Sequence, residues 1–464
     1  MSRPDLVVRG GEVVNADSIV RADICVSQGR VTALTEPGHA PSGNDEVDAT
    51  GMLVLPGGVD PHCHVGFTSG EFTTLDDYPA ATRAAVHGGT TTIVDFGIPT
   101  RGERVVDAVH RQRAQATQGF CDSALHACVV DWDESTGAQL DQLVGEGVVT
   151  VKLFTTYRDE TMANEETILR TMKHLSPLGG MVYVHCEANT IVEDTQDQVA
   201  RSGDISAGHH HETRPELAES AAVAAVLALA EHAGAPVYFV HQSTPEAVAL
   251  VEHARSEGRQ AYGEAVVHHL TLDESEYSAE HPERFVCCPP LRSARTVQGL
   301  RSKLLTGGVS TIGSDHCCYD TEQKLLTKHD VRSMPNGLPG VETRLPVAFS
   351  EFVSSGLMPV TQFVDLTATT PARLNGLYPR KGLIAPGSDA DLAIWDPEAT
   401  ATVGTSTLHM ATDYTPYEGR EIRGLPVTVL VRGEAVVRDR DFVATGAHGQ
   451  FVPATPLWDV VRAG

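Results

Sequence analysis

Two hydrophobic patterns alternate through the middle of the chain. Short apolar runs recur, and segments with helical spacing of their apolar residues separate them. Residues 217–232 form an alanine-rich helical segment, and residues 244–256 form another. The eight apolar runs cover residues 53–60, 91–96, 125–130, 148–154, 181–187, 237–243, 260–265 and 309–314.

Nearly continuous apolar runs are typical of strands that are buried on both faces of a parallel sheet. Eight βα units in succession predict an α/β fold, a (β/α)₈ barrel of the TIM type. An open doubly wound sheet is the alternative, but no G-x-G-x-x-G turn follows an early strand. The active site of a barrel lies at the C-terminal ends of its strands, so residues that follow the apolar runs are the first candidates for chemistry.

The two ends of the chain have a different texture. Residues 5–50 alternate in the manner of short strands, with Gly10-Gly11 and Gln28-Gly29 as expected turns. Residues 391–395 and 427–431 repeat this pattern near the C-terminus. We therefore expect a small β-sandwich domain built from both termini. The expected division is residues 1–56 and 379–464 for this domain and its tail, and residues 57–378 for the barrel.

Composition and charge exclude several classes of function. Of 464 residues, 35 are basic and 61 acidic, so the net charge is 35 − 61 = −26. This excess argues against nucleic acid or an anionic membrane as a partner. No apolar run is long enough to span a bilayer, and the first residues carry no signal-peptide pattern. Nine cysteines, four of them in the adjacent pairs Cys287-Cys288 and Cys317-Cys318, predict reduced thiols in a cytoplasmic protein.

Potential metal ligands coincide with the ends of the apolar runs. His62 and His64 follow the first run in the stretch PGGVDPHCH, and residues two apart on an extended chain point the same way. Imidazole pairs of this kind suit zinc. Each candidate alone fits an ordinary structural role, but their joint placement at strand ends predicts a metal site. The other candidates are Lys152, His185, His241 and Asp315.

Lys152 lies inside an apolar run, where a charged ammonium is costly to bury. A lysine in such a place loses its proton readily, and a neutral amine can take up carbon dioxide to form a carbamate. The carbamate is an anionic carboxylate that can bridge two metal ions. A lysine paired with an acid at the barrel rim is the alternative interpretation.

Longer motifs make a family resemblance specific. The chain resembles the amidohydrolase superfamily, and within it the hydantoinase/dihydropyrimidinase family of cyclic amide hydrolases. The resemblance covers essentially the whole chain from Gly10 onward. The matching stretches are PGGVDPHCH, GGTTTIVDF, VKLFTTY, VHCE, VHQSTPEA, PPLR, GSDHC, TEQK, MPNGLPGVETRLP and APGSDADLAIWDP.

The resemblance implies a binuclear zinc centre with two Zn²⁺ per subunit. His62, His64 and Asp315 would bind the more buried ion. His185 and His241 would bind the second, and N6-carboxylated Lys152 would bridge both. A hydroxide between the metals would then be the nucleophile.

Further roles come from the same resemblance. Tyr157 would hydrogen-bond the developing oxyanion, and Asp315 would carry the proton to the leaving ring nitrogen. Asn336 and Cys288 would hold the cyclic ureide edge, largely through their main chain. The family usually has serine at position 288, and a thiol is a poorer hydrogen-bonding group than a hydroxyl. Cys63 replaces a commoner threonine, and its side chain is expected to point away from the metals.

The sequence thus predicts an enzyme that opens the cyclic amide of 5-substituted hydantoins or dihydropyrimidines to give N-carbamoyl amino acids. Hydrolysis of another cyclic amide such as allantoin is the first alternative, and a non-catalytic assembly protein on the same fold is the second. The resemblance also implies a homotetramer, with a homodimer as the alternative, and residues 400–464 as a contributor to subunit contacts.

Three smaller features complete the expectations. Phe67, Phe72 and Phe154 flank the site and would suit either an apolar substituent pocket or core packing. Glu264 is expected to act as a structural acid behind the metal ligands. The run at residues 209–211 is expected to be a surface or subunit-contact loop with incidental histidines.

Overall fold

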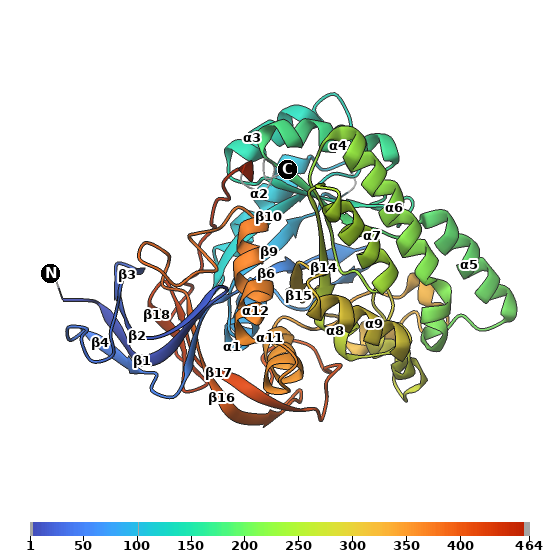
Figure 1. The fold of residues 1–464 in the computed structure, drawn as a ribbon. Helices are drawn as coiled ribbons and strands as arrows, with labels where there is room; N and C mark the ends of the chain where they lie inside the picture. Colours follow the sequence, from blue (N-terminus) through green and yellow to red (C-terminus); the bar gives the residue numbers. More distant parts are fainter. Residues whose placement is uncertain (1–2, 101, 459–464) are drawn as a thin grey trace.

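Two separate sheets organise the chain in the computed structural model, which describes residues 3–100 and 102–458. One is a parallel eight-stranded sheet that curls into a nearly closed barrel, and the other is a mostly antiparallel sheet beside it (Figure 1). The recurring apolar runs predicted the first sheet, and the short-strand patterns at the two ends of the chain predicted the second. The barrel belongs to the predicted (β/α)₈ class, and the open doubly wound alternative is wrong.

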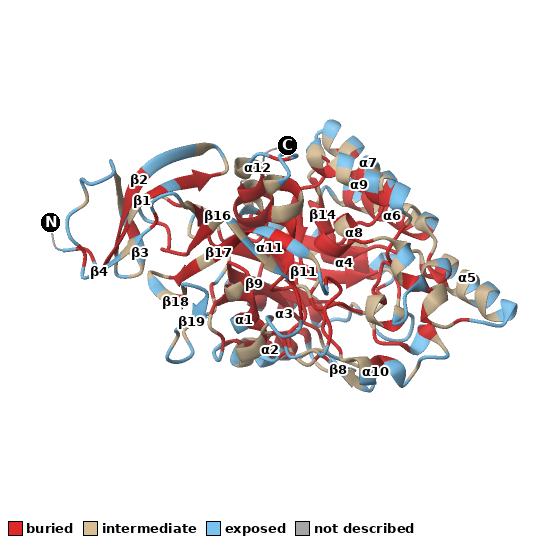
Figure 2. Cartoon of the chain, turned by 90° about the horizontal axis from the view of Figure 1, so that it is seen from below, coloured by how far each residue is buried: buried red, intermediate tan, exposed pale blue. Residues whose placement is uncertain are grey.

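Every barrel strand is parallel to its neighbours, in the spatial order β15-β14-β13-β12-β11-β10-β9-β6. Their residues are almost all buried, as Figure 2 shows for the centre of the molecule. This double-sided burial explains why the strands read as apolar runs rather than as alternating patterns. The strands are β6 (Gly58–Cys63), β9 (Thr90–Gly97), β10 (Asp122–Cys128), β11 (Thr150–Phe154), β12 (Met181–His185), β13 (Val237–Phe239), β14 (Ala261–Val266) and β15 (Thr311–Gly313).

The first apolar run is not one strand, which corrects the expectation for residues 53–60. Its first half is β5 (Leu53–Pro56), which pairs with strands of the terminal sheet, and its second half begins the barrel as β6. Gly57 joins the two. A Cβ there would lie 2.1 Å from the Thr91 hydroxyl, so only glycine fits this close crossing from one sheet to the other.

Helices cover the outside of the barrel between successive strands (Figure 1). The two helical segments predicted from sequence are confirmed as α6 (Glu216–Ala233) and α7 (Pro245–Ser256). Thr244 caps α7 by accepting a hydrogen bond from the Ala247 N–H. The other helices are α1 (Tyr78–His87), α2 (Val105–Ala116), α3 (Thr136–Gly145), α4 (Glu165–Leu175), α5 (Asn189–Ser202), α8 (Val267–Thr271), α9 (Ala294–Leu305), α10 (Thr321–Leu325), α11 (Arg344–Ala348), α12 (Val360–Val364) and α13 (Thr370–Leu374).

The second sheet brings the two ends of the chain side by side (Figure 1). Its central pairing joins β5 to β16, and β1 lies on the far side of β5. Gln28 and Gly29 form the predicted turn, with left-handed φ angles of 51° and 74°. Its strands are β1 (Leu6–Asn15), β2 (Ser18–Ser27), β3 (Arg30–Thr35), β4 (Asp45–Asp48), β5, β16 (Leu392–Thr402), β17 (Glu421–Val431), β18 (Glu434–Arg438) and β19 (Asp441–Phe442).

Gly10 and Gly11 are not a turn, contrary to the expectation. They lie inside the single strand β1, where the register with β2 shifts between Val8 and Gly11. Gly10 has a φ of 70°, which a β-bulge requires and glycine adopts without strain. The proposed domain division, with residues 57–378 as the barrel and residues 1–56 and 379–464 as the terminal domain and tail, remains a proposal.

The last described residues return to the barrel. Main-chain hydrogen bonds join Val452 to Ser123 at the start of β10, Ala454 to Gly147 before β11, and Leu457 to Gly179 before β12. The side chains of Val452 and Leu457 are buried there. This part of the tail therefore covers the end of the barrel opposite the strand C-termini. None of the helices within residues 3–100 and 102–458 has the length and hydrophobicity needed to cross a membrane.

Candidate metal centre and active site

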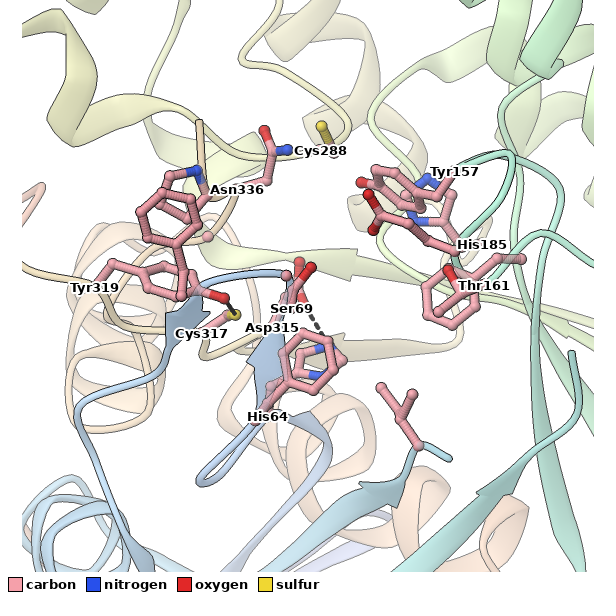
Figure 3. A pocket seen from close by; sticks show the side chains of 18 of the residues that line it. His64, Ser69, Tyr157, Thr161, His185, Cys288, Asp315, Cys317, Tyr319 and Asn336 are labelled. Atoms are coloured by element: carbon pink, nitrogen blue, oxygen red, sulfur yellow. Dashed lines mark hydrogen bonds and ion pairs between the residues drawn. The ribbon is translucent and has the colours of Figure 1, made fainter. Parts of the chain in front are cut away.

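A cavity of about 360 Å³ opens at the C-terminal ends of the barrel strands. Figure 3 shows side chains from several strand ends and loops around this space. All nine side chains singled out from the sequence line it, so the structure brings the complete predicted set together. They are His62, His64, Lys152, Tyr157, His185, His241, Cys288, Asp315 and Asn336.

His62, His64 and Asp315 form a compact group in which one ligand atom from each lies within 4.8 Å of the others. Asp315 Oδ1 lies 3.1 Å from His62 Nε2 and 3.4 Å from His64 Nε2. Contacts between the first and last barrel strands fix this geometry. Ser314 Oγ donates to His62 O at 3.1 Å, and the His64 N–H donates to His316 O at 2.8 Å.

His185 and His241 face each other across neighbouring strands. His185 ends β12, and His241 follows β13 by two residues, which places their ring centroids 4.4 Å apart. The centroid of His241 also lies 5.4 Å from that of His62, so the two histidine groups are adjacent. A left-handed φ of 36° at His241 and of 48° at Asp315 marks backbone strain at both positions.

Three of the cavity imidazoles are held in the neutral form that binds metals. Burial lowers the pKa of His62 and His241 well below the ordinary value, and it lowers that of His185 as well. Burial opposes ionisation of Asp315, but His62 and His64 outweigh it and hold the pKa of this carboxyl below its usual range. Neutral imidazoles beside an ionised carboxylate are a donor set that suits a divalent cation.

Lys152 lies in the middle of β11 and is completely buried. Its Nζ has no hydrogen-bond partner among the described residues and lies about 5 Å from the ring centres of both Phe96 and Phe154. Burial lowers its pKa to about 8, against the opposite pull of Asp315 and Glu264. The alternative of a lysine paired with a rim acid is not what the structure has, because no carboxylate lies within ion-pair distance of this amine in the described ranges.

Unpaired buried nitrogen atoms test whether the site fits a metal. His64 Nδ1, Lys152 Nζ and His241 Nδ1 are buried without a hydrogen-bond partner among the described residues, and His62 Nε2 faces only the Asp315 carboxylate, at 3.1 Å. Buried polar atoms are normally paired, so three unpaired nitrogens around one cavity need another partner. The residues present therefore fit a metal centre.

Two carboxylates behind the histidines orient them. Glu264 Oε2 lies 2.8 Å from His62 Nδ1 and accepts the His241 main-chain N–H at 2.9 Å, in agreement with its expected structural role. Glu187 was not identified from the sequence as such a residue. Its Oε2 lies 2.8 Å from His185 Nε2 and accepts from Arg214 Nη1 at 2.6 Å. In the VHCE stretch, Glu187 follows His185 by two residues, so the two side chains point the same way on an extended chain. This spacing could have identified Glu187 from the sequence as the carboxylate that orients His185.

Tyr157 follows β11 with a left-handed φ of 67° and contacts the second histidine group. Its ring centroid lies 5.4 Å from that of His185, and the Arg214 guanidinium lies 5.2 Å from the ring centre. Burial raises the pKa of the phenol well above its ordinary value. Tyr157 is therefore a hydrogen-bond donor at any working pH.

Cys288 and Asn336 lie on the side of the cavity that faces Tyr157 and His185 (Figure 3). None of the described residues makes a hydrogen bond with the main-chain N–H or C=O of either residue. The side-chain Oδ1 of Asn336 is also buried without a described partner. Burial raises the pKa of the Cys288 thiol to about 12, so this thiol is protonated.

The remaining expectations have mixed outcomes. Phe67, Phe72 and Phe154 all line the cavity, so they form part of its wall. The expectation of a surface loop at residues 209–211 is wrong for its central residue. These residues lie in a 3₁₀ helix, Ala207–Thr213, and His210 is only 1% exposed because it packs against Tyr277. All nine cysteines are buried and unpaired, as predicted for reduced thiols.

Comparisons with known proteins agree with this site. The family model described as "Amidohydrolase family" matches residues 53–436. A D-hydantoinase from Geobacillus stearothermophilus is 36% identical over 451 residues, which are 96% of this chain and 96% of that protein. A dihydropyrimidinase from Rattus norvegicus is 35% identical over 466 residues, 98% of this chain and 90% of that protein.

A solved structure extends the agreement to three dimensions. The D-hydantoinase (dihydropyrimidinase) from Thermus sp. has a TM-score of 0.95 at 34% identity, covering 98% of this chain and 100% of the other. Because the match covers nearly the whole of both chains, the two structures resemble each other in the barrel and in the terminal sheet. The chain belongs to the amidohydrolase family and, within it, to the hydantoinase/dihydropyrimidinase group of cyclic amidohydrolases.

Proposed function

We propose that this enzyme opens the ring amide of 5-substituted hydantoins or dihydropyrimidines and releases N-carbamoyl amino acids. One observation carries the proposal: nine residues predicted from sequence line a single cavity, and three buried nitrogens among them lack partners within the described part of the chain. The similarity to proteins named D-hydantoinase and dihydropyrimidinase supports the same class of substrate.

The donor set suits two divalent ions, which we infer to be zinc. His62, His64 and Asp315 would hold one ion and His185 with His241 the other, with carboxylated Lys152 between them. Two ions held in this way would activate a water molecule as nucleophile and polarise the ring carbonyl. Neutral histidines and the lowered pKa of Lys152 support this assignment.

The protein's own groups would then complete the hydrolysis. The Tyr157 hydroxyl donates to the carbonyl oxygen as negative charge develops on it. Asp315 takes the proton of the attacking water and delivers it to the ring nitrogen, whose bond to the carbonyl carbon breaks. The main chain of Cys288 and Asn336 holds the ureide edge by complementary N–H and C=O groups. Water adds across one C–N bond, so no other reactant is needed.

The cavity wall favours an apolar ring substituent. Phe67, Phe72, Ile98 and Phe154 line it, and apolar contact with them would stabilise a bulky group at ring position 5. Allantoin carries a polar ureido group at this position and would gain less from such a wall. We therefore place substituted hydantoins ahead of allantoin.

A substrate panel tests the proposal. Purified protein is assayed with dihydrouracil, with 5-substituted hydantoins of both enantiomers and with allantoin, before and after treatment with a chelator. We expect turnover of a hydantoin or of dihydrouracil that the chelator abolishes and added zinc restores. Turnover of allantoin alone would contradict the substrate assignment. Absence of both bound metal and turnover would support the non-catalytic assembly protein.

Assembly and location remain proposals of the same kind. We propose a homotetramer in the cytoplasm, on the basis of the family resemblance and the reduced cysteines. Light scattering coupled to size-exclusion chromatography measures the assembly mass. A mass of two subunits would favour the homodimer instead.

A further inference from the structure

An irregular segment, residues 285–291, carries Cys288 along the edge of the cavity. Its first residue, Phe285, ends the 3₁₀ helix Pro282–Phe285, and residues 286–291 belong to no helix or strand, so their position depends on other contacts. Buried side chains supply them by donating to successive main-chain carbonyls. Tyr277 Oη donates to Phe285 O at 3.3 Å, Lys324 Nζ to Val286 O at 2.9 Å, His210 Nε2 to Cys287 O at 2.7 Å, and His269 Nε2 to Pro289 O at 2.9 Å.

The four donors are buried and come from four separate elements. Lys324 is 0% exposed on α10, and His269 is 2% exposed on α8. His210 lies in the 3₁₀ helix Ala207–Thr213, and Tyr277 lies in the 3₁₀ helix Glu274–Ser278. Each donor thus connects the segment to a different part of the structure around it. We call this set the carbonyl clamp: His210, His269, Tyr277 and Lys324.

One residue in the middle of the segment is left out of the clamp. The C=O of Cys288 accepts no hydrogen bond, and its N–H donates none, within the described part of the chain. Cys288 is only 7% exposed, and what it exposes lines the cavity. Buried main-chain groups require partners, and a ureide edge offers both an N–H donor and a C=O acceptor.

Lys324 also couples this segment to the loop that carries Asn336. Val286 O accepts from Lys324 Nζ and from the Gly337 main-chain N–H, the latter at 3.0 Å. A single carbonyl thus joins the segment before Cys288 to the residue after Asn336. Movement of Val286 would shift both groups that face the ureide.

Burying the Lys324 amine is costly, and no ion pair in residues 3–100 and 102–458 offsets the cost, so its hydrogen bond to Val286 O is the contact to be explained. No carboxylate lies within ion-pair distance of Lys324 among the described residues, and its neighbours include the thiols of Cys287 and Cys317. Burial lowers its pKa to about 8. Either protonation state of the amine can donate to Val286 O, so the hydrogen bond persists when the proton is lost.

We propose that Lys324, His210 and His269 are positioning residues that hold the main chain of Cys288 and Asn336 in the geometry that binds the ureide edge. This inference rests on the proposed function, because it assigns those main-chain groups to substrate. It gives a role to the histidine run and to the TEQK stretch, which the catalytic assignment leaves unexplained. The clamp residues do not touch the reacting atoms.

Kinetics of metal-loaded variants provide the first test. Lys324→Met and His210→Phe remove a donor, whereas His210→Gln keeps an N–H near the position of Nε2. We expect KM for the best hydantoin or dihydropyrimidine to rise about tenfold in Lys324→Met and His210→Phe, with kcat and metal content within about threefold of the parent. His210→Gln should restore most of the affinity.

The matched control is Lys328→Met, the same exchange at an exposed lysine four positions along the chain. It should leave KM unchanged. An unaltered KM in folded Lys324→Met and His210→Phe would overturn the inference. A rise in KM accompanied by a comparable fall in kcat and in metal content would also overturn it, because that pattern indicates general damage to the site.

Hydrogen exchange gives a readout that does not depend on turnover. Amides in the peptides covering residues 286–291 and 336–338 should exchange about tenfold faster in Lys324→Met than in Lys328→Met. Equal exchange rates in the two variants would refute the clamp. If the parent enzyme hydrolyses no ureide, the proposed function fails, and the exchange experiment still decides whether Lys324 fixes these two segments.

Discussion

Among the individual side chains, Lys152 occupies the most unusual environment. Its amine is buried near two aromatic rings, has no described hydrogen-bond partner, and has a pKa lowered to about 8. A substantial fraction of the amine is therefore neutral near pH 8 and can react with carbon dioxide. Under the proposed function, the resulting anion would sit beside the unpaired histidine nitrogens and would account for a lysine at a position where it is otherwise destabilising.

Replacing Lys152 tests this account directly. Lys152→Ala should remove the bridging carboxylate, lower the metal content below two ions per subunit and reduce kcat by about a thousandfold or more. Elemental analysis and steady-state assays measure both effects. Lys173→Ala, an exposed lysine on α4, serves as the control and should change neither. Near-normal turnover with both metals bound would rule out the bridging role.

Tyr157 leads to a second prediction of a different kind. Because burial raises the pKa of its phenol, the hydroxyl stays protonated and can donate to an oxyanion throughout the working pH range. Tyr157→Phe should lower kcat by about 10²–10³-fold and change KM little, since the bond strengthens only as charge develops. Parallel assays of Tyr262→Phe, at a tyrosine outside the cavity, provide the comparison. A rise in KM at constant kcat would mean that Tyr157 binds the ground state instead.

Among the helices and strands, α1 ends in a contact that should depend on pH. His87, its last residue, stacks on His409 with ring centroids 3.5 Å apart, and its Nε2 has no described hydrogen-bond partner. Burial, with help from His409 and Arg83, lowers the pKa of His87 to about 3. The unfolded chain, with an ordinary histidine pKa, binds more protons between about pH 6.5 and pH 3. Stability should therefore fall as the pH falls through this window.

His87→Gln should remove that contribution. When the pH falls from 7 to 5, the free energy of unfolding should decrease in both proteins, and the decrease should be about 1 kcal/mol smaller in the variant than in the parent. This figure allows for the partial exposure of the ring. Urea unfolding at several pH values measures it, with metals chelated in both proteins so that the cavity histidines contribute equally. Identical pH dependence of the two proteins would contradict the assignment to His87.

Local patterns identify most of these elements but not their partners. Buried parallel strands leave a clear signature, so the barrel and the ligands at its strand ends are predictable from particular residues such as His62, His185 and Asp315. The change of sheet at Gly57 is invisible because apolar residues continue on both sides of it. His210 and Lys324 carry ordinary surface-type side chains in polar stretches. Their burial arises only when distant elements pack around residues 285–291, which no local pattern encodes.

Considered as a single body, the protein joins its two sheets through a buried group of charges. Lys381 Nζ lies 2.5 Å from Asp122 Oδ2 at the start of β10, 2.5 Å from Asp391 Oδ2 before β16, and 3.1 Å from Asp389 Oδ2. Arg432, between β17 and β18, pairs with the other oxygen of Asp122. Arg380 pairs with Asp389 at 2.7 Å. The barrel and the terminal sheet therefore share an ionic junction in which Lys381, Arg432 and Arg380 face three carboxylates.

Removing the lysine should weaken this junction far more than loss of a surface ion pair would. In Lys381→Met, Asp122 keeps Arg432 and Asp389 keeps Arg380, but the buried Asp391 carboxylate loses its ion-pair partner among the described residues. Breaking a buried pair in this way typically costs about 3–5 kcal/mol. Urea unfolding at pH 7 should show this loss, whereas Lys303→Met, which removes a partly exposed pair with Glu252, should cost less than about 1 kcal/mol. Equal losses in the two variants would mean that the sheets are held together by apolar packing and main-chain pairing alone. A large loss specific to Lys381 would mean that the terminal sheet and the catalytic barrel depend on this charge to stay joined.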